Sequence, residues 1–224
     1  MIPDVKICGL KTLETLEAAL VNGASHVGFV FFKKSPRNIS LPLAASLRDS
    51  VKGRAHVVCV TVDADNMLLD EIVYQVKPDM LQLHGAETPR RVLEIKRRYE
   101  VSVIKAIPVY DESDLLNIVP YQGIADRILF DAKLSSLMLP GGNGVSFNWQ
   151  MLDVLDEKIN YMLSGGLRVN NVVKALLTTR AKGIDVSSGV ETELGVKDVH
   201  MIKAFLDKAL SAISEGGDFY DTVI

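Results

Sequence analysis

The chain has 224 residues, of which 48% are hydrophobic and 24% charged, with a formal net charge of -3 at pH 7. This length suits one closed β/α barrel, although two small domains would also fit it, and the apolar content is ample for a large core. The lysines and arginines are scattered and the apolar runs are short, which argues against nucleic-acid binding, membrane-surface binding and membrane spans.

The first half of the chain alternates short β-rich runs with amphipathic helical stretches. Leu13, Leu16 and Leu20 fall on one face of the first predicted helix, and Gly23 ends it. Thr88 is the predicted N-cap of the fourth helix, which runs to residue 99. The predicted strands are residues 5–8, 27–31, 55–62 and 80–84, and the first three helices are residues 12–22, 43–51 and 67–76.

The second half of the chain repeats this alternation. The predicted strands are residues 103–107, 127–130, 161–163 and 184–186. Helices are predicted near residues 113–119, from residue 149 onward, and over residues 171–178 and 198–213. The last helix carries an apolar stripe on one face, formed by Val199, Ile202, Leu206, Ala209 and Ile213.

Eight βα units follow one another without a linker or a low-complexity segment. Strands that are separated by helices imply a parallel sheet. Eight near-equal units, with neither a GxGxxG motif after the first strand nor a Walker motif, favour a closed sheet. The sequence therefore predicts an α/β fold, a closed parallel (β/α)8 TIM barrel that forms a single domain over residues 1–224. An open doubly wound sheet is the alternative.

The two cysteines, Cys8 and Cys59, have no CxxC spacing. This pattern suggests neither a zinc site nor a disulfide framework, and free thiols fit a reducing compartment. Cys59 lies in the middle of a predicted strand, where we expect it to pack in the core. The first residues lack the basic and apolar regions of a signal peptide, so we predict a cytoplasmic protein.

The turns after the seventh and eighth predicted strands contain Gly165-Gly166 and Ser187-Ser188-Gly189. The active site of such a barrel lies at the C-terminal strand ends, and these two turns often hold a phosphate. Glycines let main-chain N–H groups approach a ligand closely. The turns after the third and fourth strands are acidic and nearly free of glycine, so we predict one phosphate site. The competing interpretation is two turns without a ligand.

Reactive side chains occupy the ends of the first, fourth and sixth predicted strands. The two-residue period of a strand places Lys6 and Cys8 on one face, and likewise Gln82 and His84. Asp131 follows an apolar strand, so partial desolvation should raise its pKa, which suits a general acid. Taken alone, Cys8 is as compatible with packing as with catalysis.

With these positions, the chain resembles the phosphoribosylanthranilate isomerase family along nearly its whole length. The most specific matches are Cys8-Gly9, the Gln-Leu-His-Gly strand end at residues 82–85, and the Asp-Val-Ser-Ser-Gly-Val-Glu turn at residues 185–191. Further matching segments are residues 6–10, 28–31, 35–40, 81–85, 104–106, 141–144, 147, 149 and 163–167.

The resemblance implies an Amadori rearrangement in tryptophan biosynthesis, in which N-(5-phosphoribosyl)anthranilate becomes 1-(2-carboxyphenylamino)-1-deoxyribulose 5-phosphate. It implies Cys8 as the general base, Asp131 as the general acid and Arg37 as the guanidinium that binds the anthranilate carboxylate. His84 is expected to line the pocket. The expected phosphate-binding residues are Gly142, Gly166, Ser188 and Gly189. Such an isomerisation needs neither a metal nor a cofactor.

Two further points concern the ionisation of Cys8 and the departures of this sequence from the family pattern. A free thiol with a pKa of ~8.5 is only a few per cent thiolate at neutral pH, and we expect the neighbouring Lys6 to help ionise Cys8. Asn148 stands where the family has Asp, and Asn143 stands where Ser or Thr is common. These two departures concern the loop after the sixth strand and touch neither proton-transfer group.

The alternative function is another phosphosugar-binding barrel, catalytic or not. A ribulose-phosphate epimerase would need a His/Asp metal set at several strand ends, whereas this chain offers only His84 there. An indole-glycerol-phosphate synthase relies on Lys and Glu for its acid–base chemistry, whereas the first strand here ends in Cys8. The expected partner is a small phosphosugar, and the sequence leaves both a monomer and a homodimer open.

Overall fold

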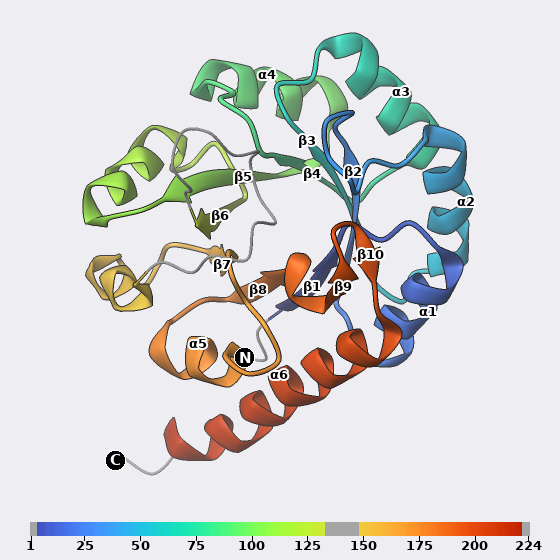
Figure 1. The fold of residues 1–224 in the computed structure, drawn as a ribbon. Helices are drawn as coiled ribbons and strands as arrows, with labels where there is room; N and C mark the ends of the chain where they lie inside the picture. The colour runs from blue at the N-terminus through green and yellow to red at the C-terminus, as the bar shows by residue number, and fades with distance from the viewer. Residues whose placement is uncertain (1–3, 133–147, 221–224) are drawn as a thin grey trace.

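A closed barrel of eight parallel strands lies at the centre of the molecule (Figure 1). The computed structural model describes residues 4–132 and 148–220. Strand β8 pairs in parallel with β1, with Ile184 opposite Val5, so the sheet closes and the predicted barrel is confirmed. The open doubly wound alternative is wrong. The barrel strands are β1 (Asp4–Cys8), β2 (His26–Phe31), β3 (His56–Thr61), β4 (Met80–Leu83), β5 (Ser102–Val109), β6 (Arg127–Ala132), β7 (Tyr161–Leu163) and β8 (Gly183–Val186).

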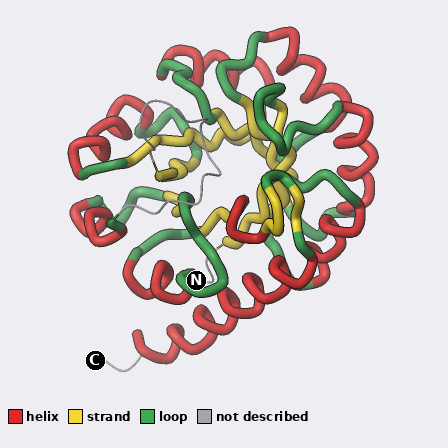
Figure 2. The backbone as a smooth tube through the Cα atoms, in the orientation of Figure 1, coloured by secondary structure: helices red, strands yellow, loops and turns green. Residues whose placement is uncertain are grey.

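Helices form a ring around the barrel (Figure 2). Thr88 is the N-cap of α4, as predicted, and its side chain accepts a hydrogen bond from the backbone N–H of Arg91. None of the helices within the described ranges is long and apolar enough to cross a membrane. The helices are α1 (Leu13–Val21), α2 (Leu41–Val51), α3 (Asn66–Val76), α4 (Pro89–Tyr99), α5 (Val172–Thr178) and α6 (Val199–Tyr220), with 3-10 helices η1 (Glu112–Tyr121), η2 (Trp149–Val154) and η3 (Ser188–Val190).

Several elements differ from the prediction. The helices expected near residues 113–119 and from residue 149 are 3-10 helices, and in η1 Pro120 lacks the N–H that an α-helix would use there. Helix α6 continues to Tyr220, beyond the predicted end at residue 213. The hairpin of β9 (Glu191–Glu193) and β10 (Val196–Lys197) was not predicted, because strands of three and two residues are too short to show a period.

Alternation along the strands divides the apolar core into two parts. One set of side chains faces the helices, and Cys59 belongs to it, as predicted for a packing residue. The other set faces inward and fills the barrel interior. Nearer the C-terminal strand ends, Cys8 forms a small cluster with Val30 and Val60. The interior residues are Val58, Ile104, Ala106, Leu129 and Met162.

Candidate active site

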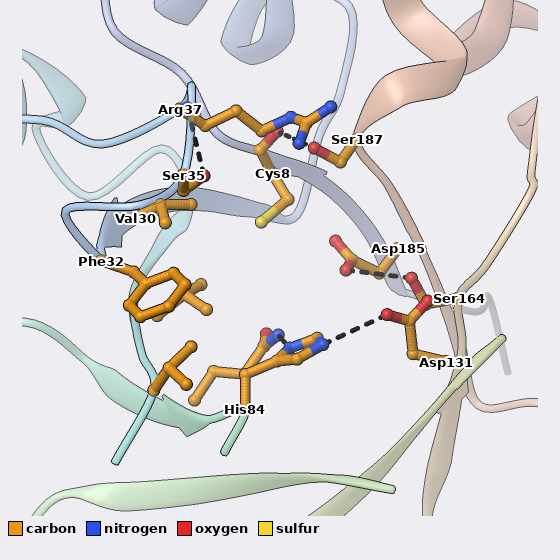
Figure 3. Close-up of a pocket in the computed structure, with 13 residues that line it drawn as sticks. Cys8, Val30, Phe32, Ser35, Arg37, His84, Asp131, Ser164, Asp185 and Ser187 are labelled. Atoms are coloured by element: carbon orange, nitrogen blue, oxygen red, sulfur yellow. Dashed lines mark hydrogen bonds and ion pairs between the residues drawn. The ribbon is translucent and has the colours of Figure 1, made fainter. Parts of the chain in front are cut away.

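A pocket opens at the C-terminal ends of the barrel strands, where side chains from β1, β2, β3, β4, β6 and β8 and from the loops that follow the strands converge (Figure 3). The empty space within and above the pocket, including open solvent, is about 500 Å³. Its apolar wall is formed by Val30, Phe32, Val60 and Val62. Its polar wall is formed by Cys8, Ser35, Arg37, Gln82, His84, Asp131, Ser164, Asp185 and Ser187.

Most of the predicted site residues come together at this pocket. Cys8, Arg37, His84 and Asp131 all line it. A smaller adjoining pocket shares Asp131 with the first and is lined by the two glycine turns, including Gly166 and Ser188. Gly189 follows Ser188 in η3. Gly142 and its neighbours at 141, 143 and 144 lie outside the described residues.

The two turns predicted to hold a phosphate lie side by side. Gly166 has a φ of 66°, in the left-handed region that glycine adopts without strain. The side-chain amide of Asn171 donates to the carbonyl of Gly166 over 2.9 Å, which ties this turn to the start of α5. Gly189 lies so close to the first turn that a Cβ there would overlap the carbonyl oxygen of Leu167. Glycine therefore permits the close approach of the two turns.

The Cys8 thiol shares its strand face with a fully buried ammonium group. Lys6 is 0% exposed, and its Nζ donates to Oδ1 of Asp185 over 2.9 Å. A Cβ at Gly28 would lie 3.0 Å from the Cys8 sulfur and 3.2 Å from the Lys6 nitrogen, so this glycine leaves room for both groups. Burial raises the pKa of Cys8, although the charges of Lys6 and Lys197 oppose that rise. Burial would lower the pKa of Lys6, but Asp185 and Cys8 outweigh it and raise that pKa.

Removing the Lys6 charge should make the Cys8 thiol harder to ionise. In Lys6→Met the midpoint of the pH dependence of Cys8 alkylation is expected to move up by about one pH unit or more, because a nearby cation favours the thiolate. The rate of iodoacetamide modification as a function of pH measures this midpoint, and Cys8→Ala gives the background from Cys59. The double variant Lys6→Met/Asp185→Asn removes the pair together and should show a smaller shift. An unchanged midpoint in Lys6→Met would show that Lys6 does not tune the thiol.

His84 connects the end of β4 to Asp131 on β6. Its Nε2 lies 3.1 Å from Oδ2 of Asp131, and its Nδ1 lies 2.9 Å from Nε2 of Gln82. Asp131 is 5% exposed. The sequence placed His84 at the pocket without a sharper role, and the structure shows it in contact with the predicted acid.

Arg37 is held by a carboxylate from the unpredicted hairpin. Its Nε and Nη2 donate to the two oxygens of Glu191, each over 2.7 Å, which orients the planar guanidinium. The Lys197 ammonium lies 2.6 Å from the same carboxylate and donates to the carbonyl of Ser187 over 2.9 Å. Burial lowers the pKa of Lys197 to about 8, against the opposing effect of Glu191. Burial would raise the pKa of Glu191, but Arg37 and Lys197 lower it.

Sequence reasoning missed three charged residues of this region. Asp185 lies within the apolar strand β8, and a charged residue inside such a short run was a usable signal. Glu191 ends the Asp-Val-Ser-Ser-Gly-Val-Glu match at residues 185–191, which was a usable signal, whereas Lys197 lies outside every matching segment and reaches Glu191 through the hairpin. Within residues 4–132 and 148–220, no group of three or more His, Cys, Asp and Glu side chains is arranged to hold a metal ion.

Comparison with known proteins gives one consistent family. Residues 5–208 match the family described as N-(5'phosphoribosyl)anthranilate (PRA) isomerase. The N-(5'-phosphoribosyl)anthranilate isomerase of Agrobacterium fabrum is 60% identical over 208 residues, which cover 92% of this chain and 94% of that protein. Two solved structures each have a TM-score of 0.81 and 32% identity, and cover 92% of this chain and 98% of theirs. One is a phosphoribosyl anthranilate isomerase in complex with reduced 1-(o-carboxyphenylamino)-1-deoxyribulose 5-phosphate, and the other shows monomers of the dimeric enzyme from Thermotoga maritima.

Proposed function

The chain belongs to the N-(5'-phosphoribosyl)anthranilate isomerase family, and on this premise we propose that it converts N-(5-phosphoribosyl)anthranilate into 1-(2-carboxyphenylamino)-1-deoxyribulose 5-phosphate in tryptophan biosynthesis. This Amadori rearrangement is an aldose–ketose isomerisation, which belongs to the intramolecular oxidoreductases. The observation that carries the proposal is one pocket that holds the thiol of Cys8 and the carboxyl group of Asp131 beside the two glycine turns.

Asp131 is the proposed acid of the first step. Its carboxyl group donates a proton to the furanose ring oxygen as the C1–O bond breaks, and the lone pair of the anthranilate nitrogen forms the C1=N bond of a Schiff base. A strand end positions this carboxyl group more rigidly than a flexible loop would, which favours a fixed geometry for proton transfer.

Cys8 is the proposed base of the second step. As a thiolate it removes the proton from C2 of the sugar, the C–H electron pair forms a C1=C2 bond, and the C1=N electrons return to nitrogen. The resulting enolamine tautomerises to the ketone. The ammonium groups of Lys6 and Lys197 favour the thiolate, but burial has the larger effect and raises the pKa of Cys8 overall. The support for Cys8 as the base is its place in the pocket that also holds Asp131.

The two ends of the substrate require different recognition groups. We propose that Arg37 binds the anthranilate carboxylate, with Glu191 fixing the orientation of the guanidinium. We propose that the turns after β7 and β8 hold the phosphate with backbone N–H groups. Gly166, Ser188 and Gly189 belong to these turns, and Gly142, which follows β6 in the sequence, is a further proposed phosphate-binding residue.

An assay with freshly generated phosphoribosylanthranilate tests the function directly. Loss of substrate fluorescence on addition of the enzyme is expected, at the same rate with and without a chelator. Cys59→Ala, which changes the thiol that faces the helices, is the matched control and should retain full activity. A folded but inactive chain would favour a non-catalytic phosphosugar-binding barrel, and activity lost with the chelator would favour a metal-dependent relative.

A further inference from the structure

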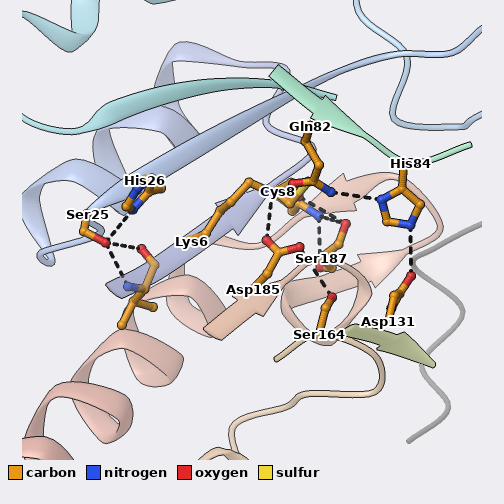
Figure 4. Close-up of polar contacts among 12 residues, drawn as sticks. Lys6, Cys8, Ser25, His26, Gln82, His84, Asp131, Ser164, Asp185 and Ser187 are labelled. Atoms are coloured by element: carbon orange, nitrogen blue, oxygen red, sulfur yellow. Dashed lines mark hydrogen bonds and ion pairs between the residues drawn. The ribbon is translucent and has the colours of Figure 1, made fainter. Parts of the chain in front are cut away.

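Three side chains at the pocket form a hydrogen-bonded chain that runs from β4 to β6 (Figure 4). Nε2 of Gln82 lies 2.9 Å from Nδ1 of His84, and Nε2 of His84 lies 3.1 Å from Oδ2 of Asp131. Gln82 is 1% exposed and Asp131 is 5% exposed, so the protein rather than bulk water supplies most of their partners. A role for these three hydrogen-bonded side chains in proton transfer would extend the proposed function, because Asp131 is the proposed general acid.

The donor and acceptor types of these groups decide where the hydrogens lie. An amide nitrogen only donates, so Gln82 donates to Nδ1 of His84, which then carries no hydrogen. A neutral imidazole in this state has its hydrogen on Nε2 and donates it to Oδ2 of Asp131. The arrangement in the structure therefore suits Asp131 after it has given up its proton.

A proton added to the pair of His84 and Asp131 changes this pattern. If the carboxyl group holds it, the O–H donates to Nε2 and the ring hydrogen must lie on Nδ1; if the ring holds it, both nitrogens carry hydrogen. In either case Nδ1–H points at Gln82, whose Oε1 can accept this hydrogen bond. In the structure Oε1 is buried, and none of the described residues forms a hydrogen bond with it.

Hydrogen bonds hold the backbone at the end of β4 in place, so the side-chain amide of Gln82 is the group that can turn. Nζ of Lys105 donates to the carbonyls of Leu83 over 3.2 Å and Gly85 over 2.7 Å, on either side of His84. Lys105 also pairs with Glu87 at 2.9 Å, and each of these side chains is 2% exposed. A half-turn of an amide about its last bond exchanges two groups of similar size and needs no backbone movement.

The other ionisable side chains that line the pocket are Cys8, Arg37 and Asp185. Arg37 is paired with Glu191, and Asp185 is paired with Lys6. Gln82 is therefore the uncharged neighbour of His84 whose donor and acceptor can exchange without breaking an ion pair.

We infer that Gln82 is a positioning residue for the acid step, whose amide turns as the pair of His84 and Asp131 gains and loses the proton that opens the sugar ring. With Oε1 toward Nδ1 the pair holds the proton. With Nε2 toward Nδ1, as in the structure, the pair has delivered it. This inference rests on the proposed role of Asp131 as the acid.

NMR of isotope-labelled histidine nitrogens tests the switch without a substrate. The chain has 4 histidines, so His84→Gln identifies the His84 signals and the others serve as references. In the wild type at about pH 9, well above the ordinary pKa values of Asp and His, the His84 hydrogen is expected on Nε2. As the pH falls and the pair takes up a proton, Nδ1 should gain hydrogen. In Gln82→Glu, whose carboxylate only accepts, Nδ1 should carry hydrogen throughout.

Kinetics separate this role from a merely structural one. Gln82→Met keeps the length of the side chain but neither donates nor accepts, so kcat should fall about 3- to 10-fold, the usual effect of one lost hydrogen bond, with KM within about twofold of wild type. A fall confined to KM would contradict the inference, as would unchanged kcat.

The wild-type titration alone can overturn the inference, so the test survives poor folding of a variant. Hydrogen on Nδ1 of wild-type His84 at about pH 9 would do so, as would an unchanged tautomer in a folded Gln82→Glu protein. If the chain proved inactive as an isomerase, the proposed function would fail, and the NMR experiment would still report separately on the hydrogen-bond switch.

Discussion

The Cys8→Ala variant is expected to fold like the wild type and to lose about 10²- to 10⁴-fold in kcat, the usual contribution of one proton-transfer group. The thiol is nearly buried at the end of β1, and alanine keeps the backbone and most of its apolar contacts with Val30 and Val60. What disappears is the base for the proton on C2. The fluorescence assay gives kcat and KM, and circular dichroism with thermal unfolding gives the state of the fold.

The chain offers a matched control for this variant. Cys59→Ala removes the other buried thiol, which lies on β3 in the core that faces the helices. Cys59 does not line the pocket, so its thiol has no access to the substrate. Cys59→Ala should keep full activity. A Cys8→Ala enzyme with more than about a tenth of wild-type kcat would mean that another group removes the proton.

The Asp131→Asn variant is expected to lose a similar factor, about 10²- to 10⁴-fold in kcat. A carboxamide has the shape of a carboxyl group but no acidic proton, so it cannot protonate the ring oxygen. The contact of His84 with position 131 can persist, because the amide oxygen still accepts a hydrogen bond from Nε2. We therefore expect an unchanged fold, and steady-state kinetics over a range of pH should show a low rate throughout.

An exposed aspartate provides the comparison for this second variant. Asp153 lies in η2, away from the pocket, and Asp153→Asn should leave kcat and KM unchanged. If Asp131→Asn retained nearly full activity while its fold and KM were normal, the ring would be opened by a different acid. In that case the proposed role of Gln82 and His84 in the acid step would also be wrong.

The strand-based part of the fold could be predicted because alternation is a local property. The two-residue period placed Lys6 and Cys8 on one face of β1, and in the structure both lie beside Gly28. The C-terminal strand-end rule likewise selected His84 and Asp131, and both line the pocket. A register error of one residue would have turned these side chains toward the helices.

The contacts around Arg37 could not be predicted, because they depend on two residues that a hairpin brings back over the barrel mouth. Neither Glu191 nor Lys197 belongs to a periodic segment, and the pairing of Glu191 with Arg37 spans 154 positions of the chain. The 3-10 form of η1 was missed for another reason. The apolar spacing of residues 113–119 indicates a helix but does not distinguish a 3-10 helix from an α-helix.

The ion pair between Lys6 and Asp185 joins residues that are 179 positions apart in the chain. During synthesis on the ribosome, β1 emerges first and β8 nearly last, so Lys6 stays without a counter-charge until most of the polypeptide exists. An unpaired ammonium group is costly to bury, and closing so long a loop slows folding. A nascent or truncated polypeptide that stops before β8 therefore keeps Lys6 in water, and enzymatic activity can begin only once the last barrel strand has been translated.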